Sequence, residues 1–169
     1  MDETQEKFER TVGNAFIAWY NRTTKSNFSY AGRPNEAPDL IYIDGTNKLL
    51  VEVGAAYSGA EEAAFWWKNL RKVPDAPRQG SGKDMDENLI TDINKRIEEK
   101  CANAYGTNCF LLVYVHPAMT TADEVEECLD QIKIPEKNPF PAIFVSGHFP
   151  SSTRSAGGYR CWKLLGNEP

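Results

Sequence analysis

Two acidic residues near the middle of the chain, Asp39 and Glu52, are placed so that a short turn can bring them together. They belong to two segments rich in β-forming residues, Asp39–Ile43 and Lys48–Val53, which flank the turn Asp44–Asn47. Strong β-formers around an Asp-Gly turn predict a hairpin. Carboxylates on neighbouring strands are ligands that a hard divalent cation accepts, so the pattern points to metal-assisted chemistry.

The position of the turn decides how the two acids face each other. If the turn is centred between residues 45 and 46, the numbers of paired residues sum to 91, and Asp39 lies directly opposite Glu52. If residues 44 and 45 form the turn, the sum is 89, Asp39 faces Leu50, and Glu52 lies one diagonal step away on the same face. Only a pairing shifted by a single residue would place the two acids on opposite faces of the hairpin.

Opposed carboxylates need a compensating charge. Directly opposed side chains in a hairpin have Cβ atoms about 4.5–5.5 Å apart, so the two acids repel each other. Residues 49–53 also resemble a buried strand, where an unpaired carboxylate is costly. A cation, a proton or exposure at a sheet edge can compensate. Mg²⁺ fits because it takes oxygen ligands and can activate water and neutralise charge on a phosphodiester. The alternative is a pair at the sheet margin that a lysine or arginine neutralises.

The rest of the chain predicts the elements that position this hairpin. The result is an α/β fold with a mixed central sheet, an N-terminal β-hairpin and helices on both faces, in a single domain over residues 1–169. Apolar periodicity predicts helices over 3–21 and 88–105, the second ending at Gly106, and aromatic anchors favour a helix over 61–72. Loops are expected over 23–38 and, as a mobile segment, 73–86; strands over 109–115, 142–146 and 159–164; and a helix opened by a capping box at Thr121.

These features resemble the PD-(D/E)xK nuclease superfamily, which has the restriction endonuclease-like fold. Pro38-Asp39, followed after twelve residues by Glu52 within Val51-Glu52-Val53, is similar to its acidic motif, and the order of elements matches over about residues 5–147. The resemblance implies hydrolysis of nucleic acid with Mg²⁺ or Mn²⁺. Asp39 and Glu52 match the metal ligands, and Glu9 on the first helix matches an assisting acid, with Glu6 as its alternative.

One position departs from the family pattern. The family has a lysine two residues after the glutamate, and this chain has Gly54 there. That lysine helps orient the attacking water and offsets developing negative charge, and some members supply it from a nearby helix. Lys68, Lys95 and Lys100 are candidates. We assign the role to Lys95, with Lys100 on the same helix also well placed; the alternative is that all three are surface lysines.

The charge distribution bears on nucleic acid as a partner. The formal net charge is −5, which on average repels phosphate backbones. The segment 68–83 is locally basic, with five basic residues and one acid. We expect it to approach phosphates, and its alternative is a solvated loop. The nucleic-acid-binding residues predicted in it are Lys68, Arg71, Lys72, Arg78 and Lys83.

Other residues yield fewer predictions. His116 and His148 each follow a buried strand and can be catalytic if those strands are neighbours; a structural or surface role is the alternative. The four cysteines are scattered without zinc-ligand spacing, which favours reduced buried thiols and a cytoplasmic location. The longest apolar run, Cys109–Val115, is too short to span a bilayer, so no membrane partner is expected. A homodimer is compatible with the sequence, but no pattern indicates one.

The leading functional prediction is therefore metal-dependent phosphodiester hydrolysis of nucleic acid. Gly54 and the acidic net charge favour a different class: a nuclease-like fold without catalysis that binds nucleic acid or protein. A third interpretation is an unrelated α/β protein whose hairpin acids are coincidental.

Overall fold

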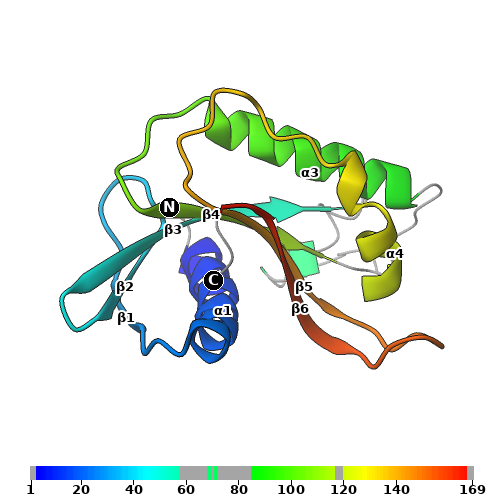
Figure 1. Cartoon of the computed structure of the whole chain (residues 1–169), viewed down its shortest axis with the longest axis horizontal. Helices are drawn as coiled ribbons and strands as arrows, with labels where there is room; N and C mark the ends of the chain where they lie inside the picture. The colour runs from blue at the N-terminus through cyan, green and yellow to red at the C-terminus, as the bar shows by residue number, and fades with distance from the viewer. Residues whose placement is uncertain (1–2, 58–67, 70, 72–84, 117–119, 167–169) are drawn as a thin grey trace.

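A six-stranded mixed sheet forms the centre of the protein (Figure 1). The computed structural model describes residues 3–57, 68, 69, 71, 85–116 and 120–166. The strands follow one another across the sheet in chain order: β1 (Ser29–Gly32), β2 (Leu40–Asp44), β3 (Asn47–Ala56), β4 (Cys109–Val115), β5 (Ile143–Phe149) and β6 (Gly158–Leu165). Strands β3, β4 and β5 are parallel, and the other neighbours are antiparallel. The predicted α/β class with a mixed sheet is confirmed.

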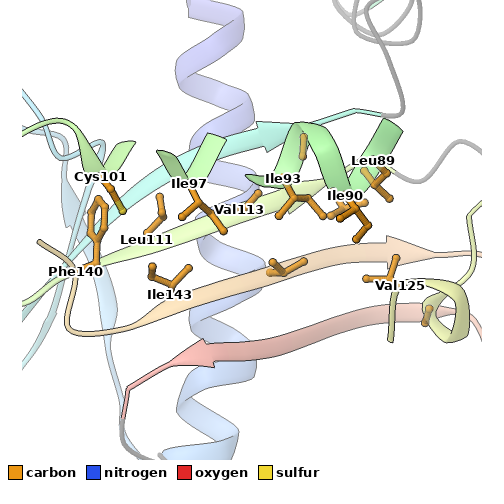
Figure 2. Close-up of a cluster of buried hydrophobic side chains, with 14 of the residues drawn as sticks. Leu89, Ile90, Ile93, Ile97, Cys101, Leu111, Val113, Val125, Phe140 and Ile143 are labelled. Atoms are coloured by element: carbon orange, nitrogen blue, oxygen red, sulfur yellow. The ribbon is translucent and has the colours of Figure 1, made fainter. Parts of the chain in front are cut away.

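Helices cover both faces of this sheet. Helix α1 (Glu3–Thr24) packs on one face, and α3 (Met85–Cys101) packs on the other (Figure 1). Leu89, Ile90, Ile93 and Ile97 of α3 form one core with β4 and β5, which Figure 2 shows. Helix α4 (Ala122–Glu127), followed by a short 3₁₀ turn (Leu129–Gln131), joins that core through Val125. Its predicted capping box is present at Thr121 and Glu124.

Helix α1 approaches the hairpin closely because it has a glycine at the point of contact. A Cβ atom added to Gly13 would lie 2.2 Å from Leu40 Cδ1 and 2.5 Å from the Tyr42 hydroxyl oxygen. The Tyr42 hydroxyl donates to Asn14 Oδ1 at 3.1 Å. This contact fixes the first helix against β2, and it thereby fixes the position of Glu9 one turn before Gly13.

Several predicted boundaries are wrong. The segment 23–38 contains β1, a short edge strand whose pairing with β2 shifts between Tyr30 and Gly32, so its sequence lacks a clear alternating pattern. Helix α3 ends at Cys101 rather than near Gly106 because the Asn103 side chain donates to the Glu99 carbonyl at 3.1 Å and caps the last turn. The predicted loop 73–86 and the predicted helix 61–72 lie mostly outside the described residues. Within them, residues 85 and 86 already belong to α3, and residues 68 and 69 are helical.

Strand β3 is longer than predicted, and its residues alternate between the two faces. Leu49, Val51 and Val53 pack with α1, whereas Leu50 and Ala56 pack with α3. Glu52 therefore faces α3. No helix among the described residues has the length and apolar character needed to cross a membrane.

Candidate functional site

The hairpin has the first of the two predicted registers. Leu40 pairs with Val51 and Asp44 pairs with Asn47, so paired residue numbers sum to 91, and Gly45 takes the positive φ of 58° that the turn requires. Asp39 precedes β2 directly, and its Oδ2 accepts a hydrogen bond from the Val53 amide at 2.9 Å. The acid thus reaches the backbone of β3 immediately beside Glu52.

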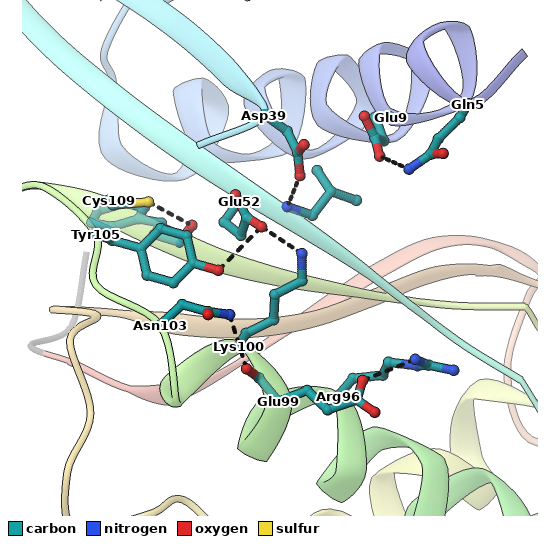
Figure 3. A network of polar contacts seen from close by, with 12 residues as sticks. Gln5, Glu9, Asp39, Glu52, Arg96, Glu99, Lys100, Asn103, Tyr105 and Cys109 are labelled. Atoms are coloured by element: carbon teal, nitrogen blue, oxygen red, sulfur yellow. Dashed lines mark hydrogen bonds and ion pairs between the residues drawn. The ribbon is translucent and has the colours of Figure 1, made fainter. Parts of the chain in front are cut away.

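Glu52 is a buried carboxylate with one paired oxygen. Only 4% of the residue is exposed. Its Oε1 accepts hydrogen bonds from the Lys100 amine and, at 3.2 Å, from the Tyr105 hydroxyl (Figure 3). Its Oε2 is buried and has no hydrogen-bond partner among the described residues. Burial raises the pKa of Glu52 and the charge of Asp39 raises it further, against the opposing effects of Lys100 and Tyr105.

Lys100 reaches Glu52 from the opposite layer. It lies in the last turn of α3, three residues after Ile97 and seven after Ile93, so it shares their inward face. Lys95, to which the sequence assigned this role, points away: its side chain is 62% exposed, and its Nζ lies 3.9 Å from Glu99 Oε1. Lys68 is also exposed. The lysine beside the acid is therefore Lys100, which the sequence offered with Lys95 on the same helix.

Arg33 is a component of the site that no sequence pattern indicated. It lies in the loop between β1 and β2, and one guanidinium links two acids. Its Nη1 lies 2.5 Å from Glu9 Oε2, and its Nη2 lies 2.8 Å from Asp39 Oδ1. Glu9 Oε1 also accepts from the Gln5 side chain at 2.9 Å. Glu9 is buried within this group, whereas Glu6, its alternative, is exposed.

A cleft of about 380 Å³ opens beside these groups. Its lining includes Glu9 of α1, Asp39, residues 53–55 of β3, and Arg96, Glu99 and Lys100 of α3. Glu52 does not line the cleft; it lies behind the Lys100 amine that does. Arg96 is held by Asp92 at 3.5 Å and by Glu99 at 3.0 Å. Acidic and basic side chains therefore line the same cleft.

Gly54 leaves space at the position where the family has its lysine. A Cβ added there would have as its nearest neighbour the Arg96 Cβ at 3.8 Å, which is an ordinary van der Waals contact. Residue 54 follows Glu52 by two positions in β3, so the two residues lie on the same face of the strand. The surrounding structure therefore has room for a side chain at residue 54.

The remaining candidates stand apart from this cleft or outside the described residues. Lys68 and Arg71 are exposed, and Lys72, Arg78 and Lys83 lie outside the part of the chain that the structure describes. The nucleic-acid-binding role of all five stays a prediction. Tyr57, which lines the cleft, donates its backbone amide to Asp92 Oδ2 at 2.9 Å.

The two histidines belong to neighbouring parallel strands, His116 directly after β4 and His148 within β5 rather than after it, and they differ in environment. His116 is 4% exposed and stacks between Tyr57, with ring centroids 4.7 Å apart, and Phe8, at 5.2 Å. Burial lowers the pKa of His116 to about 4, so the ring is neutral at physiological pH. His148 is exposed, and its Nδ1 lies 3.4 Å from the Tyr114 hydroxyl. The packing of His116 matches the structural alternative.

The donor set fits a hard divalent cation in its chemistry. Asp39, directly before β2, and Glu52 of β3 supply carboxylate oxygens, and Glu9 supplies another from α1. One buried Glu52 oxygen lacks a hydrogen-bond partner among the described residues. As arranged, however, Arg33 and Lys100 already form ion pairs with all three acids. Accordingly, no three metal-ligating side chains in the described ranges converge on a ready-made site. An ion can enter here by displacing a cation from at least one carboxylate.

Comparison with protein-family models, with curated proteins and with solved structures finds no significant match to this chain.

Proposed function

We propose that this chain is a restriction endonuclease-like, metal-dependent phosphodiester hydrolase that acts on nucleic acid. The observation that supports it best is the Lys100 amine beside Glu52, next to Asp39 and at the edge of a cleft. Although the chain lacks the lysine of the motif at residue 54, Lys100 of α3 places an amine beside Glu52. The order helix, antiparallel strands, helix, parallel strand also agrees with the resemblance.

Each residue then has a role that its position allows. Asp39 and Glu52 would hold Mg²⁺ or Mn²⁺, which when bound supplies Lewis acidity and an acidified water. Lys100 would hold the attacking water and offset the negative charge that develops on the phosphate oxygens. Glu9 would hold the Arg33 guanidinium at the site. The wall formed by Arg96 would face the phosphate backbone.

A second function is favoured by a specific observation. Arg33 and Lys100 pair with Glu9, Asp39 and Glu52 without any metal, which is the arrangement expected of a site that only binds. In this alternative the cleft recognises an anionic or protein partner and cleaves nothing. The net charge of −5 is consistent with it.

Metal titration and cleavage, measured on the same proteins, separate these functions. At a Mn²⁺ concentration ten times the Kd, binding to the native state alone adds about 1.4 kcal/mol, which for a domain of this size raises Tm by about 4 °C. Wild type should show this shift, and Glu52→Gln should not. Glu98→Gln is the matched control, because Glu98 is an exposed acid of the same helix that carries Lys100.

The cleavage arm uses single- and double-stranded DNA and RNA with Mg²⁺, Mn²⁺ or EDTA. Cleavage by wild type and by Glu98→Gln, lost in Glu52→Gln and in EDTA, supports the hydrolase. A metal-induced Tm shift without cleavage of any of these substrates supports the binding function. Absence of any shift in the wild type, under conditions where the protein is folded, overturns the metal-dependent hydrolase.

A further inference from the structure

Arg33 contacts Asp39, the acid that an ion in the proposed site would have to reach. Its guanidinium is largely buried, with 15% of the side chain exposed, and it uses two different nitrogens for two different acids. The Glu9 and Asp39 side chains are 8% and 13% exposed. Charge-assisted contacts of this length between buried groups are strong, and the planar fork of arginine holds both carboxylates in fixed positions.

The charges of the site explain why the arginine and a metal ion exclude each other. Glu9, Asp39 and Glu52 contribute three negative charges, and Arg33 and Lys100 contribute two positive ones, so the group has a formal charge of −1. A divalent cation on Asp39 would lie beside a guanidinium that already contacts Oδ1. Repulsion between the two cations would oppose joint binding, since both would be poorly screened in a site of this burial.

Asp39 has no spare oxygen facing away from this conflict. Its Oδ1 accepts from Arg33, and its Oδ2 accepts from the Val53 amide, which is part of the β3 backbone and cannot withdraw without distorting the strand. The arginine, in contrast, belongs to the loop between β1 and β2. Of the two partners of Asp39, Arg33 is therefore the one that an incoming ion can displace.

We propose that Arg33 is the resting counter-ion of the site and competes with a divalent cation for Asp39 and Glu9. This inference rests on the proposed function, because it concerns the same metal. In the metal-free protein the guanidinium keeps the two acids together and stable. On metal binding it leaves both acids, and the cost of breaking these two ion pairs weakens the apparent affinity for the ion.

The test is direct binding of Mn²⁺, measured by calorimetry and by the loss of the electron paramagnetic resonance signal of free Mn²⁺. Arg33→Gln removes the charge and keeps a hydrogen-bond donor, and Arg33→Lys keeps the charge without the fork. Arg22→Gln is the matched control, because Arg22 is an exposed arginine near the end of α1. Thermal unfolding confirms that each variant is folded, and Glu52→Gln in each background confirms where the ion binds.

We expect Arg33→Gln to bind Mn²⁺ at least tenfold more tightly than wild type, Arg33→Lys to lie between them, and Arg22→Gln to equal wild type. In the metal-free state Arg33→Gln should have a lower Tm than wild type. The same substitution should therefore destabilise the protein and raise its affinity for Mn²⁺. A merely structural arginine would lower Tm and leave affinity unchanged or weaker.

The outcomes distinguish this inference from the proposed function. If wild type binds Mn²⁺ and Arg33→Gln binds it equally or less tightly, the competition is wrong and the hydrolase proposal stands. If only Arg33→Gln binds, the competition is supported and the arginine excludes the ion from the natural protein, which overturns the hydrolase. If neither protein binds Mn²⁺, both proposals are overturned.

Discussion

Moving the lysine from α3 to β3 tests the geometry on which the proposed function depends. Lys100→Met removes the amine beside Glu52 and keeps a side chain of similar length. Gly54→Lys places a lysine two residues after Glu52, where the added Cβ meets only the Arg96 Cβ at 3.8 Å. Gly54→Met is the control, because any side chain in place of glycine changes strand stability on its own.

The expected magnitude follows from the burial of the pair. Removing one partner of a buried ion pair costs about 3–5 kcal/mol when the other charge stays buried. The Lys100 side chain is 27% exposed, so water reaches the amine and reduces this cost. Glu52 can also escape the penalty by taking up a proton, since its pKa is already raised by burial. We therefore expect Lys100→Met to lower the free energy of unfolding by about 2 kcal/mol at pH 8.

The pH dependence of this loss has a defined sign. A raised pKa means that folded Glu52 holds its proton more tightly than the unfolded chain does, so the folded state is favoured at low pH and loses that advantage as pH rises through the folded pKa. Without Lys100 the pKa of Glu52 rises further, because an opposing cation is gone. The difference in stability between wild type and Lys100→Met should therefore be smaller at pH 5 than at pH 8.

Urea unfolding measures the coupling in six proteins: the natural, Gly54→Lys and Gly54→Met backgrounds, each with and without Lys100→Met. In the Gly54→Lys background, Lys100→Met should cost about 1 kcal/mol less than in the natural background, and in the Gly54→Met background it should cost the same as in the natural one. If the proposed hydrolase activity is present, Lys100→Met should reduce it by a factor of about 100 or more, and the double variant should recover part of it. A cost below about 0.5 kcal/mol for Lys100→Met, or an equal cost in both lysine and methionine backgrounds, would refute the reasoning.

Two further predictions concern parts of the fold that frame the cleft. Burial lowers the pKa of His116 to about 4, so the unfolded chain binds its proton more tightly; the stability from the neutral ring is complete above pH 6.5 and falls by about 3 kcal/mol as pH drops to 4. His116→Phe should show a flatter profile in urea unfolding from pH 7 to 4, and an unchanged slope would contradict the assignment. Gly13→Ala should lower stability by about 1–3 kcal/mol, because its Cβ would overlap Leu40 Cδ1 at 2.2 Å. Thermal unfolding against Ala15→Gly, a change of the opposite kind on the same helix, measures that cost, and a neutral result would show that the helix can shift away from the hairpin.

The hairpin was predictable because its register depends on local sequence. The Asp-Gly turn and the β-branched and aromatic residues around it fix the pairing within a few residues. Only the two registers in which paired residue numbers sum to 91 or 89 were compatible with the pattern. Both registers place Asp39 and Glu52 on one face, so the choice between them did not matter for the prediction. Strand β1 was missed because it is a short edge strand whose pairing, not its composition, makes it a strand.

The choice between Lys95 and Lys100 could have been made from helical phase alone. Ile93 and Ile97 recur at helical spacing within the predicted helix 88–105, and both are buried. Lys100 follows them by seven and three positions and shares their face, whereas Lys95 lies two positions from each and points to the opposite side. The sequence therefore indicates which lysine faces the sheet. It does not indicate how far along the helix axis that lysine lies from Glu52.

Arg33, in contrast, could not have been found from the sequence. Its contact with Glu9 spans 24 positions and its contact with Asp39 spans six, through a loop without periodicity. A hydrophobic pattern sets which face of a helix or strand is buried, but it does not set where a long side chain from an irregular loop ends. The contact of Arg33 with the two acids can therefore be identified only from the three-dimensional structure.

The distribution of partners among the carboxylate oxygens is what makes this group more than a satisfied structural cluster. Arg33 and Gln5 pair both oxygens of Glu9, and Arg33 and the β3 backbone pair both oxygens of Asp39. Glu52 differs: two donors converge on Oε1, while Oε2 is buried with no hydrogen-bond partner among the described residues. A cluster that served stability alone would gain by sharing those donors between the two oxygens, since an unsatisfied buried acceptor costs about 1–3 kcal/mol. Oε2 belongs to the residue directly before Val53, whose amide donates to Asp39. Under the proposed function a cation that reached this oxygen would satisfy it, and Glu52→Gln would remove the charge that attracts the ion.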